Sequence, residues 1–148
     1  MTQILIVEAR FYEDIADELV SGAAARLEEA GARVDRVAVP GAFEIPAAIA
    51  MANRAASHGG TAYDGFIALG CVIRGETSHY DYVCGESARG LQDLAIREGL
   101  AIGYGILTVE NAEQAWARAS VAGNKNKGRD AAEACLAMLD LKRRFNPV

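Results

Sequence analysis

Apolar residues follow two different patterns along this chain, and each pattern predicts one kind of secondary structure. Ile4–Val7 is a short unbroken run rich in branched residues, which is typical of a strand covered on both faces in a parallel sheet. From about Glu13 the apolar residues recur every four positions, which predicts an amphipathic helix that Gly31 can end. These positions are Ile15, Leu19, Ala23 and Leu27.

The two patterns keep alternating toward the C-terminus. Further strands are predicted over Arg33–Val39, Gly65–Ile73 and Ala101–Val109. Further helices are predicted over Ala47–Ala56, from near Tyr80 to Glu98, from Asn111 through Arg118, and from about Arg129 onward. Strands that alternate with helices favour a parallel sheet. We therefore predict an α/β, three-layer α/β/α, flavodoxin-like fold with a four-stranded parallel sheet flanked by helices on both faces.

Prolines, caps and glycines support these boundaries. Pro40 ends the second strand, and Pro46 suits the first turn of the next helix because its missing N–H would have no helical partner there. Asn111, with a glutamine three residues later, forms a capping box. Gly103 and Gly105 lie inside the last predicted strand, which predicts close approach of another backbone at that point.

The composition is that of one globular domain, which we expect to span residues 1–148. Of the 148 residues, 51% are hydrophobic and 24% are charged, which excludes disordered and collagen-like chains. A net charge of -5 with scattered basic residues argues against nucleic acid or an anionic membrane surface as the main partner. The longest uncharged stretch, Gly99–Val109, is far shorter than the ~17–25 residues of a transmembrane helix.

The cysteines point to a reducing compartment. Cys71, Cys84 and Cys135 are odd in number, lie in apolar surroundings and include no CxxC pair, so we interpret them as buried thiols. The first twenty residues carry several charged side chains, which a secretory signal would not tolerate. The expected location is the cytoplasm.

Candidate chemistry lies in the loops that follow the strands, because ligands bind at the carboxyl ends of strands in open α/β sheets. Phe11 follows the first strand, and Phe43 and Glu44 lie between two prolines after the second. The third such loop, Arg74–Asp81, is the richest, since it combines a glycine, two hydroxyls, a histidine and several charges.

Each of these residues also has a structural interpretation. Phe11 could pack as a hydrophobic staple on its own helix, and Phe43 could belong to the core. Glu44 before a helix favours the helix dipole by ~0.3–1 kcal/mol, and Thr77 and Ser78 could be ordinary N-caps. A cap and an anion site use the same exposed N–H groups, so these interpretations are compatible with ligand binding.

His79 is the sharpest candidate, because imidazole exchanges protons freely near neutral pH. The alternative is a surface histidine, an interpretation that suits His58 better. Glu76, His79 and Asp81 could hold a metal, but they lack HExxH or paired-cysteine spacing. The chain also has no P-loop, no GxGxxG after the first strand and no GxSxG nucleophile elbow.

Three motifs at the predicted loops give the chain a family resemblance. They are Gly41–Pro46, Arg74–Tyr80 and Asn126–Gly128, and together they resemble the 6,7-dimethyl-8-ribityllumazine synthase family over nearly the whole chain. The resemblance implies a transferase that condenses 5-amino-6-ribitylamino-uracil with 3,4-dihydroxy-2-butanone 4-phosphate, losing phosphate and water in the penultimate step of riboflavin biosynthesis. It implies two small-molecule substrates and no metal or redox cofactor.

The resemblance also implies residue roles. His79 would be the general acid/base, Phe11 would stack on the pyrimidine, and Asp130 would relay a proton. The implied substrate-binding residues are Phe11, Gly41, Ala42, Phe43, Glu44, Val72, Ile73, Gly75, Glu76, Thr77, Tyr104, Arg118 and Lys127. Among these, Glu44 and its neighbours would hold the ribityl chain, and Thr77 with Arg118 would hold the phosphate. For Lys127 and Asp130, a solvated helix start is the alternative.

Some positions depart from the family pattern. Tyr12 stands where many members have Asn, and Tyr104 stands where Phe is common. The Gly123–Gly128 stretch is longer than usual, which leaves the choice between Lys125 and Lys127 open, with Lys127 preferred because a glycine follows it.

The resemblance also bears on assembly. Family members form pentamers with active sites between neighbours, so we expect a homopentamer or a pair of pentamers, with Tyr104 and Arg118 arriving from the adjacent subunit. The helix over Ala47–Ala56 is apolar almost all round, which predicts cover on more than one side, within the domain or from another subunit. Two rival functions are an archaeal-type riboflavin synthase and a non-catalytic flavin- or lumazine-binding scaffold.

Overall fold

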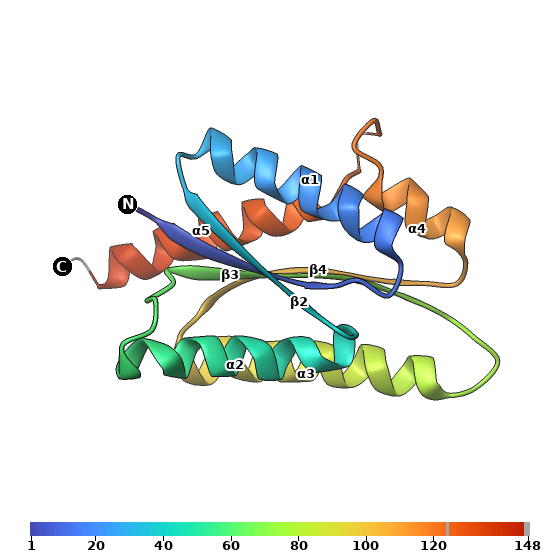
Figure 1. Ribbon diagram of the computed structural model, residues 1–148, viewed down its shortest axis with the longest axis horizontal. Coiled ribbons are helices and arrows are strands. Elements are labelled where there is room, and N and C mark those ends of the chain that lie inside the picture. The colour runs from blue at the N-terminus through green and yellow to red at the C-terminus, as the bar shows by residue number, and fades with distance from the viewer. Residues whose placement is uncertain (124, 147–148) are drawn as a thin grey trace.

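Strands and helices alternate along the chain in the predicted order (Figure 1). The computed structural model describes residues 1–123 and 125–146, so Asn124 and the last two residues of the predicted domain lie outside it. The strands are β1 (Gln3–Ala9), β2 (Arg33–Val39), β3 (Gly65–Ile73) and β4 (Ala101–Val109). The helices are α1 (Glu13–Glu29), α2 (Ile45–Ala55), α3 (His79–Glu98), α4 (Ala112–Ala119) and α5 (Lys127–Phe145), with short 3-10 turns η1 (Ala42–Glu44) and η2 (Ala56–His58).

The four strands form one sheet in the order β2-β1-β3-β4, and all three pairings are parallel. Helices α1, α4 and α5 cover one face of the sheet, and α2 and α3 cover the other (Figure 1). This confirms the predicted three-layer, flavodoxin-like fold. In the described residues, no helix has the length and apolar character needed to cross a bilayer.

The unbroken apolar run of β1 reflects the two covered faces. Ile4 and Ile6 pack in the core under α1 and α5, whereas Leu5 and Val7 pack in the core against α2. All four side chains are buried. Because successive side chains of a strand point to opposite faces, a strand between two helical layers needs apolar residues at every position.

Two helices begin earlier than the sequence predicts. Turn η1 leads directly into α2, so this helix starts at Ile45 and Pro46 lies in its first turn as expected. Helix α5 starts at Lys127, because the Asn126 side chain caps it by accepting from the Arg129 N–H at 2.8 Å. Within this chain α2 is left uncovered on its outer side, where Met51 is 69% exposed.

Glycines end two helices of this fold and let a third helix pack closely on β4. Gly31 and Gly99 have φ of 73° and 64° and follow α1 and α3, where left-handed backbone ends the helices. A Cβ on Gly103 would lie 2.0 Å from the Ala131 carbonyl oxygen of α5, and one on Gly105 would lie 3.0 Å from the Ala131 Cβ. The predicted close approach is therefore the packing of α5 on β4.

The predicted capping box is also present. The Asn111 side chain accepts from the Gln114 N–H at 2.8 Å, and the Gln114 side chain accepts at 2.8 Å from the N–H of Glu110. The reciprocal bond thus reaches one residue before the cap.

Candidate active site

A hollow of about 530 Å³ opens at the carboxyl ends of the strands, on the side of α2 and α3. It lies where the strand order changes direction, since β2 is on one side of β1 and β3 is on the other, and ligands of open α/β sheets bind at such points. Its lining residues are Phe11, Tyr12, Pro40, Gly41, Ala42, Phe43, Glu44, Cys71, Val72, Ile73, His79, Tyr82 and Val83. Three separate loops of the chain therefore meet in one place.

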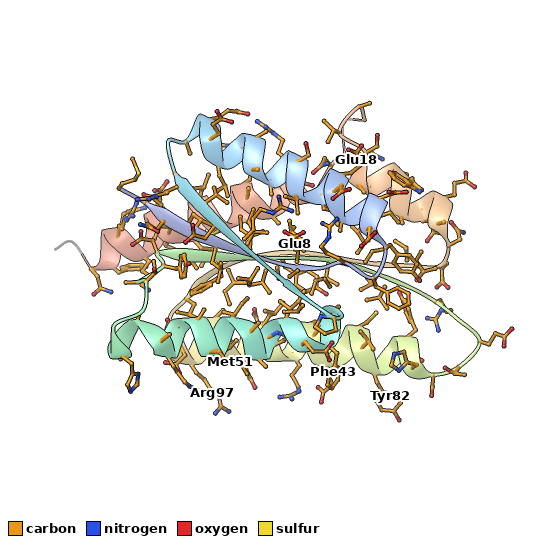
Figure 2. All side chains as sticks on the ribbon, viewed as in Figure 1. Glu8, Glu18, Phe43, Met51, Tyr82 and Arg97 are labelled. Atoms are coloured by element: carbon orange, nitrogen blue, oxygen red, sulfur yellow. The ribbon has the colours of Figure 1, made fainter. Side chains whose placement is uncertain are left out.

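Phe11 and Phe43 face this hollow and are not core residues. Phe11 is 74% exposed and Phe43 is 54% exposed, so the alternatives of a packed staple and a core ring are wrong. Tyr12 contacts Phe11 edge to face, with ring centroids 4.9 Å apart. Figure 2 shows Phe43 and Tyr82 on the α2 and α3 side of the sheet. The hollow thus offers aromatic faces to a planar ligand.

The end of β3 brings main-chain polar groups to the hollow. Its pairing with β1 stops at Leu69, whereas its pairing with β4 continues to Ile73. Among the described residues, the part of β3 after Leu69 therefore has a strand neighbour on one edge only. Val72 and Ile73 lie in this stretch, where backbone donors and acceptors can serve a ligand.

His79 is the first residue of α3 and lines the hollow. Its backbone N–H donates to the Thr77 hydroxyl at 3.3 Å, whereas Ser78, at the N-cap position, makes no side-chain cap bond. Of the two predicted caps, Thr77 is the one that acts.

Arg74 ties the histidine loop to the end of β4. Its N–H donates to the Val109 carbonyl at 2.9 Å, and its guanidinium donates to Glu110 at 2.8 Å. The same guanidinium lies 4.3 Å above the Tyr80 ring and 3.5 Å from the Asp81 carboxylate. These contacts link the start of α3 to the end of β4.

Cys71 lines the hollow as a buried thiol. Burial raises the pKa of this thiol to about 11, so the sulfur stays protonated at neutral pH. Burial likewise raises the pKa of Cys135 to about 12. The expectation of buried thiols holds for these two, whereas Cys84 is only half-buried.

The other predicted site residues lie elsewhere in the chain. Tyr104, Arg118 and Lys127 line a separate hollow of about 280 Å³ along β4. Asp130 pairs with Lys127 at 3.4 Å. Gly75, Glu76 and Thr77 lie in the exposed loop before α3, outside the lining of both hollows. One chain therefore does not bring Arg118 and His79 into one hollow.

Across residues 1–123 and 125–146, no three His, Cys, Asp or Glu side chains are placed to hold a metal ion, and this includes the Glu76, His79 and Asp81 set. Tyr82 and Val83 also line the hollow, and neither was predicted as a site residue from the sequence. Their spacing of three and four residues from His79 on a helix was the available signal.

Known proteins resemble this chain over nearly its whole length. The family model described as 6,7-dimethyl-8-ribityllumazine synthase matches residues 1–143. The chain belongs to this family. The protein of that name from Agrobacterium fabrum is 62% identical over 142 residues, covering 96% of this chain and 95% of its own. 6,7-Dimethyl-8-ribityllumazine synthase 1 of Rhizobium meliloti is also 62% identical, with 96% and 92% covered, and the Methylorubrum extorquens PA1 protein is 58% identical, with 98% and 83% covered.

In this member of the lumazine synthase family, a buried ion-pair network lies behind the Phe11 loop. Glu8 is 2% exposed on the α1 side of β1 (Figure 2). It accepts hydrogen bonds from Arg10 at 2.6 Å and from Arg36 at 2.7 Å and 3.0 Å. Arg10 also donates to Asp17 of α1 at 2.6 Å. Burial acts to raise the pKa of Glu8, but the hydrogen bonds from Arg36 and Arg10 outweigh it and hold the pKa below its ordinary value.

Glu8→Gln is expected to destabilise the protein by about 2 kcal/mol at pH 7, because charge-assisted bonds to a buried carboxylate are lost. The expected loss of stability is modest because Arg36 is half exposed and its guanidinium can hydrogen-bond to water instead. Since the folded pKa is lowered, the Glu8 contribution is present above the ordinary pKa of 4.5 and is lost as the pH falls through the folded value. Urea unfolding between pH 7 and pH 3 measures this effect.

The exposed Glu28 of α1 provides the control, as Glu28→Gln. The difference between wild type and Glu8→Gln should shrink on acidification, and the control should track the wild type throughout. A Glu8→Gln protein as stable as the wild type at pH 7 would show that the network contributes nothing.

Proposed function

We propose that this protein condenses 5-amino-6-ribitylamino-uracil with 3,4-dihydroxy-2-butanone 4-phosphate to 6,7-dimethyl-8-ribityllumazine, releasing phosphate and water in the penultimate step of riboflavin biosynthesis. The observation that carries the proposal is the meeting of Phe11, Glu44 and His79 in one hollow of a lumazine synthase family member. A stacking ring, a polar acceptor and a proton-transfer group are what this condensation requires.

The aminouracil binds against Phe11, whose exposed ring stacks on the pyrimidine. The backbone of Val72 and Ile73 meets the ring edge at the end of β3. The ribityl chain runs along Gly41–Glu44, where the Glu44 carboxylate accepts from its hydroxyls and backbone N–H groups donate.

The butanone phosphate binds beside His79, with its phosphate at the exposed Gly75–Thr77 loop. The start of α3 supports an anion there, because its N–H groups and dipole favour negative charge. Arg118 completes the phosphate site as a bidentate donor, and Lys127 adds positive charge with Asp130 beside it.

The reaction then proceeds by attack of the pyrimidine amine on the ketone, which forms an imine and releases one water. Elimination of phosphate follows, and ring closure releases a second water. Each step moves protons at neutral pH, and His79 gives and takes them as general acid/base. Holding two reactants side by side supplies a large part of the rate. The reaction needs no metal or redox cofactor.

A neighbouring protomer brings the second hollow to the first. Arg118 lines a hollow with Tyr104 and Lys127 along β4, apart from His79. The exposed outer side of α2, with Met51, favours assembly as well. We place this protein in a homopentamer, or a pair of pentamers, in the cytoplasm, a location that the buried free thiols favour.

The purified protein, mixed with both substrates, is expected to form lumazine faster than the uncatalysed reaction, as followed by lumazine fluorescence. Absence of product above the uncatalysed rate would reject the proposal. Consumption of lumazine to riboflavin would instead identify an archaeal-type riboflavin synthase, and binding of lumazine without turnover would identify a scaffold.

A mixing experiment tests the shared site. His79→Ala and Arg118→Ala proteins, each of low activity, are dissociated and reassembled together in equal amounts. In a ring, about a quarter of the interfaces then pair an intact His79 with an intact Arg118, so about a quarter of wild-type activity should return. Reassembly of each variant alone is the control, and no recovery in the mixture would place both residues in one protomer's site.

A further inference from the structure

Asn126 is a buried polar side chain where α1, α4 and α5 meet. It is 8% exposed. Its amide nitrogen donates to the Ala119 carbonyl at 2.6 Å and to the Glu18 carbonyl at 3.0 Å, and its oxygen accepts from the Arg129 N–H at 2.8 Å. The amide nitrogen faces two carbonyls and the amide oxygen faces one N–H, so the partners determine the orientation of the amide.

These bonds exceed what a helix cap requires. An ordinary N-cap only accepts from its own helix, as Asn111 does for α4 at 2.8 Å. Asn126 also donates to the carbonyl of Ala119, the last residue of α4, and to the Glu18 carbonyl within α1. Glu18 adds a contact of its own, since its side chain accepts from the Val121 N–H at 3.2 Å, and Figure 2 shows it on α1 beside α4.

Two glycines, Gly22 and Gly128, leave room for this amide between α1 and α5. A Cβ on Gly22 of α1 would lie 2.1 Å from the Asn126 side-chain oxygen. A Cβ on Gly128 would lie 1.9 Å from the Leu19 carbonyl oxygen. Both glycines are buried, so α1 and α5 approach each other closely around the amide. The position of Asn126 is therefore tightly determined by three helices.

Asn126 joins the end of α4 to the start of α5, and these two helix ends carry the basic residues of the hollow along β4. Arg118 directly precedes Ala119, the last residue of α4, and Lys127 directly follows Asn126 as the first residue of α5. Both basic side chains line the same hollow along β4. One amide thus fixes the backbone to which each of them is attached. The start of α5 adds its positive dipole at that place.

We infer that Asn126 is a positioning residue for anion binding: its amide sets the spacing of Arg118 and Lys127 so that both reach one phosphate group. This inference rests on the proposed function, which assigns these two residues to the phosphate of the butanone substrate. A bidentate guanidinium and an ammonium bind one phosphate together only when their separation is correct, so a shift of α4 relative to α5 weakens binding.

Two variants test this role. Asn126→Asp keeps the acceptor for Arg129 but turns the two donors into an oxygen that faces two carbonyls. Asn126→Ser also keeps a cap but is too short to bridge the helices, and it serves if the aspartate variant fails to fold. The matched control is Asn111→Ser, which shortens an exposed cap that touches its own helix alone.

The KM for the butanone phosphate and the inhibition constant of inorganic phosphate should each rise by about tenfold in a folded Asn126 variant. The KM for the aminouracil should stay within about twofold, because its site lies in the other hollow. In Asn111→Ser, the KM for the butanone phosphate and the inhibition constant of inorganic phosphate should both be unchanged. A purely structural role would raise both substrate KM values alike, and that result, or no change, overturns the inference.

Titration with inorganic phosphate separates this inference from the proposed function. If the wild type forms no lumazine but binds phosphate, weaker binding by Asn126→Ser still supports the positioning role. If the wild type forms lumazine and the variant keeps its phosphate affinity, the inference alone fails. If the wild type does not bind phosphate at all, the inference is wrong irrespective of the reaction.

Discussion

Replacement of His79 by alanine is expected to lower kcat for lumazine formation by about 10²–10⁴-fold, the usual contribution of a positioned general acid/base. The side chain lies at the start of α3 in the hollow with Phe11 and Glu44, and Arg74 fixes that start to β4. Turnover should persist at a low level, because the two bound reactants remain oriented toward each other. Stopped-flow or steady-state lumazine formation measures the loss.

The second histidine provides the matched control. His58 lies in η2, with a ring nitrogen 3.2 Å from the Arg54 carbonyl oxygen, and does not line the hollow. His58→Ala should therefore leave kcat within about twofold of the wild type. Added imidazole should restore part of the activity of His79→Ala, and it should not change the activity of His58→Ala. Unchanged turnover in His79→Ala would remove its proposed role.

Gly103→Ala is expected to destabilise the protein by about 3 kcal/mol or more, the upper range for overpacking a core. The added Cβ would lie 2.0 Å from the Ala131 carbonyl oxygen and 2.8 Å from the Ala131 carbonyl carbon, which are backbone atoms of α5. A flexible side chain could move aside, but here the whole helix must shift from β4. Urea unfolding at fixed protein concentration measures the change.

The opposite sign is expected at an open glycine. Gly85 lies on the exposed side of α3, with no atom within 4 Å of an added Cβ. Gly85→Ala should stabilise the protein by roughly 0.5–1 kcal/mol, because alanine loses less backbone entropy in a helix. A Gly103→Ala protein with wild-type stability would mean that α5 can move away from β4 at no cost.

The order of the elements and the layer architecture could be predicted from the sequence. The unbroken run at Ile4–Val7 and the four-residue spacing before Gly31 are local patterns, and each one reports how a single element is covered. The limits of β4 over Ala101–Val109 agree with the prediction at both ends. The starts of α2 and α5 differ because η1 and the Asn126 cap depend on the path of a loop, which carries no periodicity.

The candidate site was predictable only in part. The rule that ligands bind at strand ends selected Phe11, Phe43, Glu44 and His79, and the structure gathers all four in one hollow. It did not distinguish an exposed Phe11 from a packed one, because both place an aromatic ring before a helix. It also did not select Tyr82, since a tyrosine one turn into a helix is common on any exposed face.

The sequence by itself determined the family, the strand and helix order, and the loops that carry the chemistry, because all of these depend on residues close together along the chain. Only the tertiary structure decided which distant groups meet. Burial of Glu8 between Arg10 and Arg36, and the three bonds of Asn126 to α1, α4 and α5, join atoms from separate elements. Such partners are set by how whole helices and strands pack, and packing at close range follows from the three-dimensional shape of the core.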